Sequence, residues 1–207
     1  MIDKIFSFLL QDSSEVPDLL EVLGLSEWYS ELSEEEQQKL YEYSTAFGAG
    51  GEFNQLDQPV QSTSKTQQGY LKGVGSSAIN NKDNQFAEKV LLKGLNAEDS
   101  NPTDKHFVYN SLIKLYYKQR DNRDDAIEKC VKYCREDIES VQSFLDAWDG
   151  EPPRIPAFKR LAIIYDKQEN YQEAIEICDK ALQLGLSDGT KGGFEGRKQR
   201  LQNKIDR

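Results

Sequence analysis

Two cysteines lie one helical turn apart, at positions 130 and 134, and a third lies at position 178. Because cysteine thiolates bind zinc, the pair Cys130 and Cys134 could contribute to a metal site. The single histidine, His106, is remote from this pair in the sequence, and the chain has no Cys-x-x-Cys motif. We therefore predict no metal site and interpret the three cysteines as buried free thiols of a reduced protein.

Three consecutive glutamates at residues 34–36 could serve acid/base or metal chemistry. They follow Ser33 directly, and Ser33 with Glu36 forms the sequence pattern of a helix capping box. Carboxylates also suit the positive end of a helix dipole, so we expect a solvated first helical turn. His106 has no evident acid/base partner in the sequence, and we expect an ordinary surface or packing residue in the first turn of a helix.

Glycine-rich stretches at residues 48–51 and at Gly189, Gly192 and Gly193 could cradle a phosphate group. A phosphate loop continues with Gly-Lys-Ser/Thr, and neither stretch does so. No nucleophile–base pair and no set of metal ligands is evident elsewhere. We predict that the protein is not an enzyme and has no catalytic residues and no cofactor.

The charge balance argues against nucleic-acid binding. The chain has 207 residues, a formal net charge of −10 and a sequence pI near 4.8, whereas phosphate contacts need a surplus of Lys and Arg. No stretch of 18 apolar residues is present, so we predict a cytoplasmic protein with no membrane partner. Residues 2–10 have the apolar spacing of a short helix, which we expect to pack on the next helices; a membrane-surface or partner helix is the alternative.

The chain is organised around residues 156–186, which have the pattern of two amphipathic helices joined by a polar turn. Apolar residues recur at offsets of three, four and seven, the spacing of one helix face. The first stripe contains Phe158, Leu161, Ala162 and Tyr165, and the second contains Ala174, Ile175, Cys178, Ala181 and Leu182. The small residues Ala162 and Ala174 stand where the two helices must approach closely, so we predict a helical hairpin.

This hairpin resembles the tetratricopeptide repeat. The family pattern is carried by Phe158, Leu161-Ala162, Tyr165, Ala174 and Cys178; Ala162 replaces the usual Gly, Cys178 replaces the usual Phe, and the closing Pro is absent. Weaker copies precede it, one with Leu71, Val74-Gly75, Ala78, Ala87, Leu91 and Gly94, the other with Tyr109, Leu112-Ile113, Tyr116, Ala126 and Cys130. The resemblance implies an all-α array of helical hairpins in a right-handed superhelix that binds other proteins.

Four parts of the chain are expected. They are an N-terminal helical subdomain (residues 1–47), a flexible linker or loop (48–66), three hairpins (67–101, 106–148 and 155–188) and a C-terminal cap helix (189–207). Three repeats are the usual minimum for a stable array, and the last apolar face needs a cap.

The second hairpin departs from the repeat length, because the apolar stripe continues beyond Cys130 in steps of four and three. Its members are Ile127, Val131, Cys134, Ile138, Val141, Leu145 and Trp148. This spacing predicts one continuous helix over residues 124–148 that packs on its neighbours. The alternative is a homodimer seam, which would make the protein a homo-oligomeric structural element.

In proteins of this family the first helices of successive hairpins line a concave groove, and the resemblance implies that a partner segment lies there. The predicted groove residues are Lys72, Ser76, Asn110, Lys114, Tyr117, Lys118, Lys159, Arg160, Ile163 and Lys167. Cations dominate this face of an acidic chain, so we predict an acidic partner protein or peptide. The alternative is that Lys118 and Lys167 complement helix dipoles and the other cations solvate the face.

Some family members clamp a C-terminal carboxylate with basic and amide side chains in this groove. Lys72 and Arg160 match that set, whereas Ser76, Ser111 and Pro156 depart from it. An adaptor for an acidic C-terminal tail is therefore a second alternative.

Overall fold

The computed structural model describes residues 16–45, 53–99 and 101–206. Within these ranges the chain forms eleven α-helices, one short 3-10 helix (η1) and no β-strand, which confirms the all-α prediction. The first elements are α2 (Asp18–Val22), α3 (Ser26–Ser30), α4 (Glu34–Tyr43) and η1 (Gln55–Asp57). Then follow α5 (Gln67–Asn80), α6 (Asn84–Leu95), α7 (Pro102–Gln119), α8 (Ala126–Glu139), α9 (Val141–Ala147), α10 (Pro156–Lys167), α11 (Tyr171–Gln183) and α12 (Gly193–Ile205).

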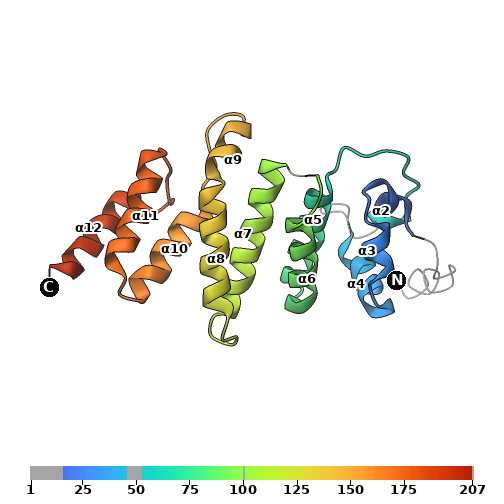
Figure 1. The fold of residues 1–207 in the computed structure, drawn as a ribbon, viewed down its shortest axis with the longest axis horizontal. Helices are drawn as coiled ribbons and strands as arrows, with labels where there is room; N and C mark the ends of the chain where they lie inside the picture. The colour runs from blue at the N-terminus through green and yellow to red at the C-terminus, as the bar shows by residue number, and fades with distance from the viewer. Residues whose placement is uncertain (1–15, 46–52, 100, 207) are drawn as a thin grey trace.

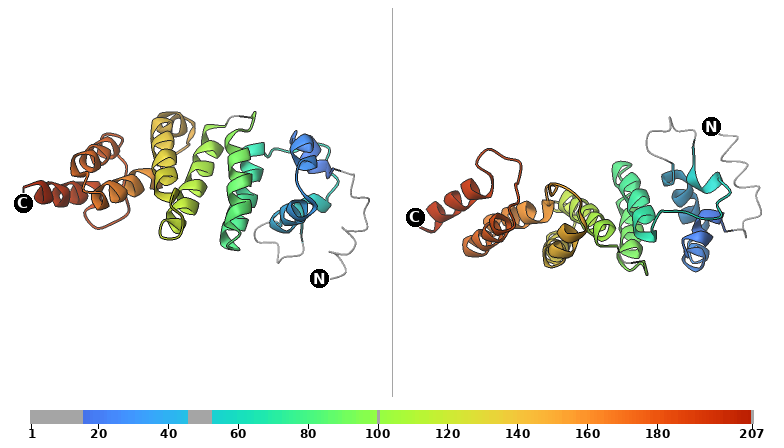
Figure 2. Two further views of the ribbon diagram at one scale, coloured as in Figure 1. Left: turned by 60° about the horizontal axis from the view of Figure 1, so that its bottom comes forward. Right: turned by 90° about the horizontal axis from the view of Figure 1, so that it is seen from above.

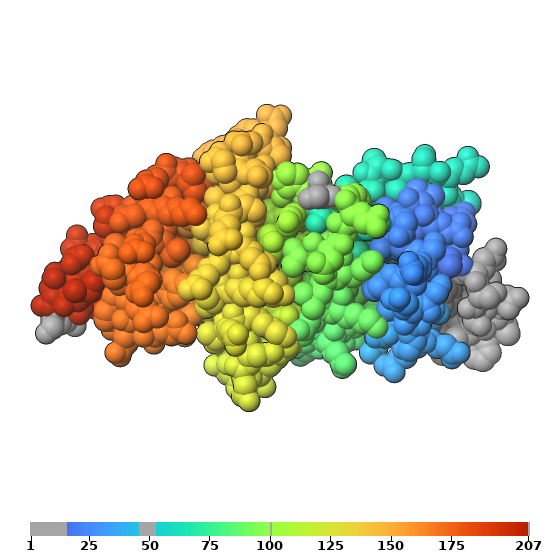
Figure 3. All heavy atoms as spheres, in the orientation of Figure 1, coloured from blue at the N-terminus to red at the C-terminus, as the bar shows by residue number. Residues whose placement is uncertain are grey.

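The hairpins α5–α6, α7–α8 and α10–α11 follow one another along the long axis of the molecule, with α2–α4 at one end and α12 at the other (Figures 1 and 2). The two helices of each hairpin pack together; α7 also packs on α5 and α6, and α10 packs on α8. Helix α12 covers α11, as expected for a cap. The hairpins therefore form one elongated body (Figure 3).

The first and third hairpins close through the same turn. Lys82 and Glu169 each have a positive φ, 65° and 62°, at the same place between the two helices. In the first hairpin Asp83 donates a backbone hydrogen bond to Ala78, and in the third Asn170 donates one to Tyr165. Ala78 and Tyr165 therefore occupy the same position in their hairpins, as the matching of the two repeats in the sequence predicts.

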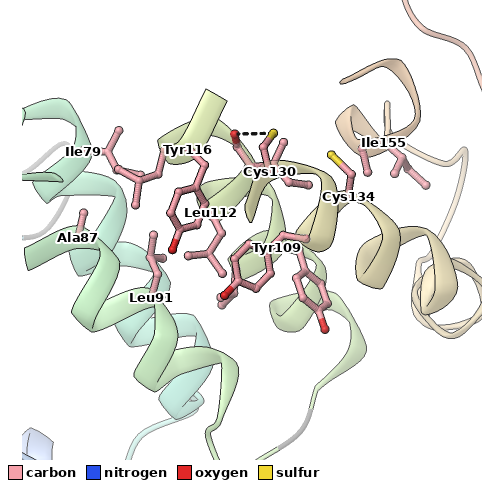
Figure 4. Packing of buried hydrophobic residues seen from close by; sticks show 14 of the residues in the cluster. Ile79, Ala87, Leu91, Tyr109, Leu112, Tyr116, Cys130, Cys134 and Ile155 are labelled. Atoms are coloured by element: carbon pink, nitrogen blue, oxygen red, sulfur yellow. Dashed lines mark hydrogen bonds between the residues drawn. The ribbon is translucent and has the colours of Figure 1, made fainter. Parts of the chain in front are cut away.

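Small residues allow the paired helices to approach. A Cβ atom on Gly75 would lie 2.6 Å from the side chain of Leu91, so no larger residue fits there without movement. In the third hairpin Ala162 occupies the position of Gly75 and Cys178 that of Leu91, and both are fully buried, as is Ala174. Behind these contacts lies one continuous apolar core, which Figure 4 shows between the first and third hairpins.

A cluster of charged side chains joins α6 to the second hairpin. The carboxylate of Glu88 accepts hydrogen bonds from Arg123, from the hydroxyl of Tyr116 at 2.8 Å and from Lys129 at 3.1 Å. Arg123 also binds Asp125 at 2.5 Å. Because these groups come from α6, α7, α8 and the turn between α7 and α8, the cluster fixes two successive hairpins relative to each other.

The N-terminal helices dock onto the first hairpin. Ser33 and Glu36 form the predicted capping box of α4. Glu36 pairs with Lys89 at 2.7 Å, and the hydroxyls of Ser44 and Tyr70 are hydrogen-bonded at 2.7 Å. Helix α4 ends at Tyr43. The predicted helix at residues 2–10 and glycines 48–51 lie outside the described residues.

Residues 53–66 run along the N-terminal helices before α5 begins. Leu56 in η1 is buried, and the side-chain amide of Asn54 donates to the carbonyl of Tyr41 at 2.6 Å. This part of the expected linker is therefore a packed loop. The division of the chain at residues 47 and 66 remains a prediction.

The prediction of a continuous helix over residues 124–148 is wrong, because Ser140 separates α8 from α9. The Ser140 hydroxyl donates to the carbonyls of Glu136 and Asp137 and so competes with the helical backbone hydrogen bonds. After this break α9 packs on α7, where Phe144 stacks on His106 at 3.9 Å between ring centroids. The stripe that suggested a dimer seam is therefore covered largely by the chain itself.

Candidate functional site

The first helices of the hairpins bring the predicted basic residues onto adjoining positions. Lys72 on α5 lies 5.4 Å from the ring centroid of Phe107 on α7. One turn further along, the hydroxyls of Ser76 and Ser111 are 3.3 Å apart, and Lys114 reaches Asn80 at 3.5 Å. Polar and cationic side chains thus follow the seam between α5 and α7.

The seam between α7 and α10 centres on Tyr117. The guanidinium of Arg160 lies 3.5 Å from the centroid of the Tyr117 ring, and that of Arg120 lies 4.5 Å from it. Both distances are within the range of a cation–π interaction. The Nε atom of Arg160 is buried and has no hydrogen-bond partner among the described residues. This arginine therefore retains a donor that nothing in the described chain satisfies.

A pocket of about 220 Å³ adjoins Tyr117 at the ends of α7 and α10. Its lining residues are Tyr117, Arg120, Asp121, Ile127, Ile164, Lys167 and Gln168. Two of these, Tyr117 and Lys167, were predicted as groove residues from the sequence. The sequence analysis did not predict the remaining lining residues. For Arg120 and Asp121 the available signal was the longer polar turn of the second hairpin, in which both lie.

Other predicted groove residues do not join these seams. Lys159 donates to the backbone carbonyl of Asp188, in the loop before α12, at 3.3 Å. Asn110 is hydrogen-bonded to the Nε2 atom of His106 at 2.9 Å. Lys118 is exposed near the end of α7, and Ile163 is half-buried on α10.

His106 has an acid/base partner that the sequence did not reveal. Its Nδ1 atom lies 2.7 Å from a carboxylate oxygen of Asp137 on α8, and both side chains are almost fully buried. Burial raises the pKa of Asp137, although the hydrogen bond from His106 opposes the shift. Asp137 falls one turn after Cys134 on the inward face of its helix, and that position was the available signal. The pair joins α7 to α8 inside the core.

The cysteines are free and buried, as predicted. The Cys130 thiol donates to the carbonyl of Ile113 at 3.7 Å, as the dashed line in Figure 4 marks. A hydrogen bond between the two thiols lowers the pKa of Cys130 and raises that of Cys134, and burial raises the pKa of Cys178 to about 11. In the described ranges, His, Cys, Asp and Glu side chains form no group of three that could hold a metal ion.

The remaining predicted clusters take structural positions. Residues 34–36 form the first turn of α4, and Glu36 is engaged in the cap and with Lys89. Gly189 and Gly192 lie in the loop before α12, and Gly193 is the first residue of that helix. All three have positive φ angles, which glycine adopts without strain. None of the helices in the described part of the chain is both long enough and apolar enough to span a membrane.

Comparisons with known proteins agree with this arrangement. Residues 155–185, which contain helices α10 and α11, match the tetratricopeptide repeat family. The chain is also similar to an uncharacterized protein of Aquifex aeolicus (strain VF5), with 26% identity over 216 residues that cover 99% of this chain and 100% of that protein. No solved structure matches the chain. The repeat in a helical array supports a protein–protein interaction module in general terms.

Proposed function

We propose that the protein is a non-catalytic interaction module that holds an acidic segment of another protein against α5, α7 and α10. The observation that carries the proposal is the run of cations along the two seams, from Lys72 and Lys114 to Arg160. These residues lie on one side of successive hairpins in a chain whose net charge is −10. A local positive surface on an acidic protein attracts acidic ligands.

The guanidinium of Arg160 adds a reason for specific binding, because it lies on the Tyr117 ring and makes no ion pair among the described residues. A carboxylate that accepts hydrogen bonds from its terminal N–H groups would pair this charge. Hydrogen bonds between charged groups contribute about 1.5–3 kcal/mol when water is excluded, so loss of one reduces affinity about tenfold or more. An exposed ion pair contributes far less.

The test is affinity capture from an extract of the organism that makes the protein, with quantitative mass spectrometry and cross-linking. We expect the wild-type chain to capture proteins whose cross-linked segments are acidic. Capture should be lost with the double variant Lys114→Glu/Arg160→Glu, which reverses two charges of the basic face. Added salt should weaken capture, because it screens these charges.

The matched control is Lys65→Glu/Lys191→Glu. It makes the same change in net charge at two exposed lysines outside the three first helices. If both double variants capture the same proteins as the wild type, or if the cross-links fall on α6 and α11, the proposal is wrong.

A further inference from the structure

The pocket beside Tyr117 differs from the rest of the basic face because its walls are apolar. Ile164 is almost fully buried and forms part of the floor, and Ile127 and the Tyr117 ring are partly exposed. The volume of about 220 Å³ equals that of several water molecules, which occupy about 30 Å³ each in the liquid. Release of water from such walls favours an apolar side chain over a polar one.

The charges around the pocket are unevenly compensated. Arg120 pairs with Asp121 at 3.2 Å and also donates to the carbonyl of Tyr117 at 2.8 Å. In contrast, neither Arg160 nor Lys167 makes an ion pair within the described ranges. The pocket and its border therefore keep two uncompensated positive charges.

These two cations stand on opposite sides of the apolar floor. Arg160, Ile164 and Lys167 have the spacing of one stripe along α10. At 1.5 Å per residue, Arg160 precedes Ile164 by about 6 Å and Lys167 follows it by about 4.5 Å. A segment that crosses the pocket along this stripe meets a cation both before and after the apolar floor.

We propose that the pocket receives one large apolar side chain from an internal segment of the partner protein, and that acidic residues on both sides of this side chain bind Arg160 and Lys167. This inference rests on the proposed function and specifies the ligand: an acidic–apolar–acidic segment. An internal segment can place one acidic side chain on each side of the apolar residue, so that both cations are paired.

The probe is a phage-displayed library of random 12-residue peptides that have no free carboxyl terminus, selected on the full chain. We expect enriched peptides to carry a large apolar residue with Asp or Glu within two positions on each side. Synthetic copies should lose affinity about tenfold when the apolar residue becomes Ala, because the pocket then stays hydrated. This peptide change tests the pocket without altering the fold of the protein.

Variants of the protein complete the test. Ile127→Gln makes one wall polar and Arg160→Gln removes the partly buried flanking charge; each should weaken binding about tenfold at low salt. Lys167→Gln removes an exposed charge and should weaken binding about threefold. Lys191→Gln is the control and should stay within twofold of the wild type, and thermal unfolding checks that every variant is folded.

The outcomes separate the two proposals. If acidic peptides lose affinity with Arg160→Gln but tolerate both Ile127→Gln and the peptide Ala substitution, the pocket assignment is overturned while the proposed function stands. If no acidic peptide is enriched, both fail. If synthetic peptides bind as free acids but not as C-terminal amides, the ligand is a chain terminus and the internal segment is overturned.

Discussion

Replacement of Glu88 by Gln should destabilise the protein in a way that depends on pH. Glu88 lies on α6, and its carboxylate binds Arg123 and Lys129 from the second hairpin. Glutamine keeps the size of the side chain and removes its charge. The change therefore isolates the electrostatic part of the contact between the first two hairpins.

The magnitude follows from the environment of the carboxylate. Burial by itself raises the pKa of Glu88, but hydrogen bonds from Arg123, Tyr116 and Lys129 outweigh it and lower the pKa from 4.5 to about 2. A shift of this size corresponds to at most about 3.5 kcal/mol, since one pKa unit is about 1.4 kcal/mol. The cluster is partly open to water, which screens its charges, so we expect about 1–2 kcal/mol at pH 7.

The sign of the pH dependence is fixed by the direction of the shift. The pKa of Glu88 is lower in the folded chain than in the unfolded chain, so the ionised carboxylate stabilises the fold above about pH 5. That contribution is lost as the pH falls from about 5 towards 2. The difference between wild type and Glu88→Gln should shrink over the same interval.

The assay is urea unfolding of both proteins between pH 7 and pH 2.5, with thermal unfolding as a second measure. For a chain of this size, about 1 kcal/mol corresponds to about 2–4 °C in Tm. Glu128→Gln, at an exposed position of α8, is the matched control and should change stability by less than about 0.5 kcal/mol. An equal stability of wild type and Glu88→Gln at pH 7, or a difference that persists unchanged to pH 3, would refute the reasoning.

Three further substitutions or reagents test other contacts. Ala174→Leu should cost about 1–3 kcal/mol by overpacking the third hairpin, and an unchanged urea midpoint would contradict the close packing around Ala174. His106→Ala should cost about 3–5 kcal/mol, because it leaves the buried Asp137 carboxylate uncompensated; a loss below about 1 kcal/mol in urea unfolding would show that the pair is dispensable. A thiol reagent should modify the native protein at all three cysteines no faster than global unfolding allows, and rapid labelling would contradict their burial.

The sequence by itself was sufficient for the three hairpins and for most of their helices. Apolar residues at helical spacing predicted where the helices lie, and Ser33 with Glu36 predicted where α4 begins, since these signals act within one or two turns of the chain. The spacing from Ala78 to Ala87 also gave the register of the first hairpin. The small residues at the hairpin contacts followed from the same local pattern.

Local patterns failed where the decisive contact was distant along the chain. The stripe beyond Cys130 favours a continuous helix, but Ser140 breaks it and Phe144 then reaches His106 on another helix. The pairing of His106 with Asp137 likewise joins two helices whose relative rotation no local spacing specifies.

Some features of the candidate site could also be predicted from the sequence, and others depended on the tertiary structure. The sequence determined that α5, α7 and α10 carry outward cations, because the face of a helix follows from residue spacing alone. Only the tertiary structure decided that Lys159 turns to the loop before α12, that Arg160 lies on Tyr117 and that Ile127 and Ile164 form a pocket between cations. Those relations depend on how successive hairpins pack, and that packing is set by side chains far apart in the sequence.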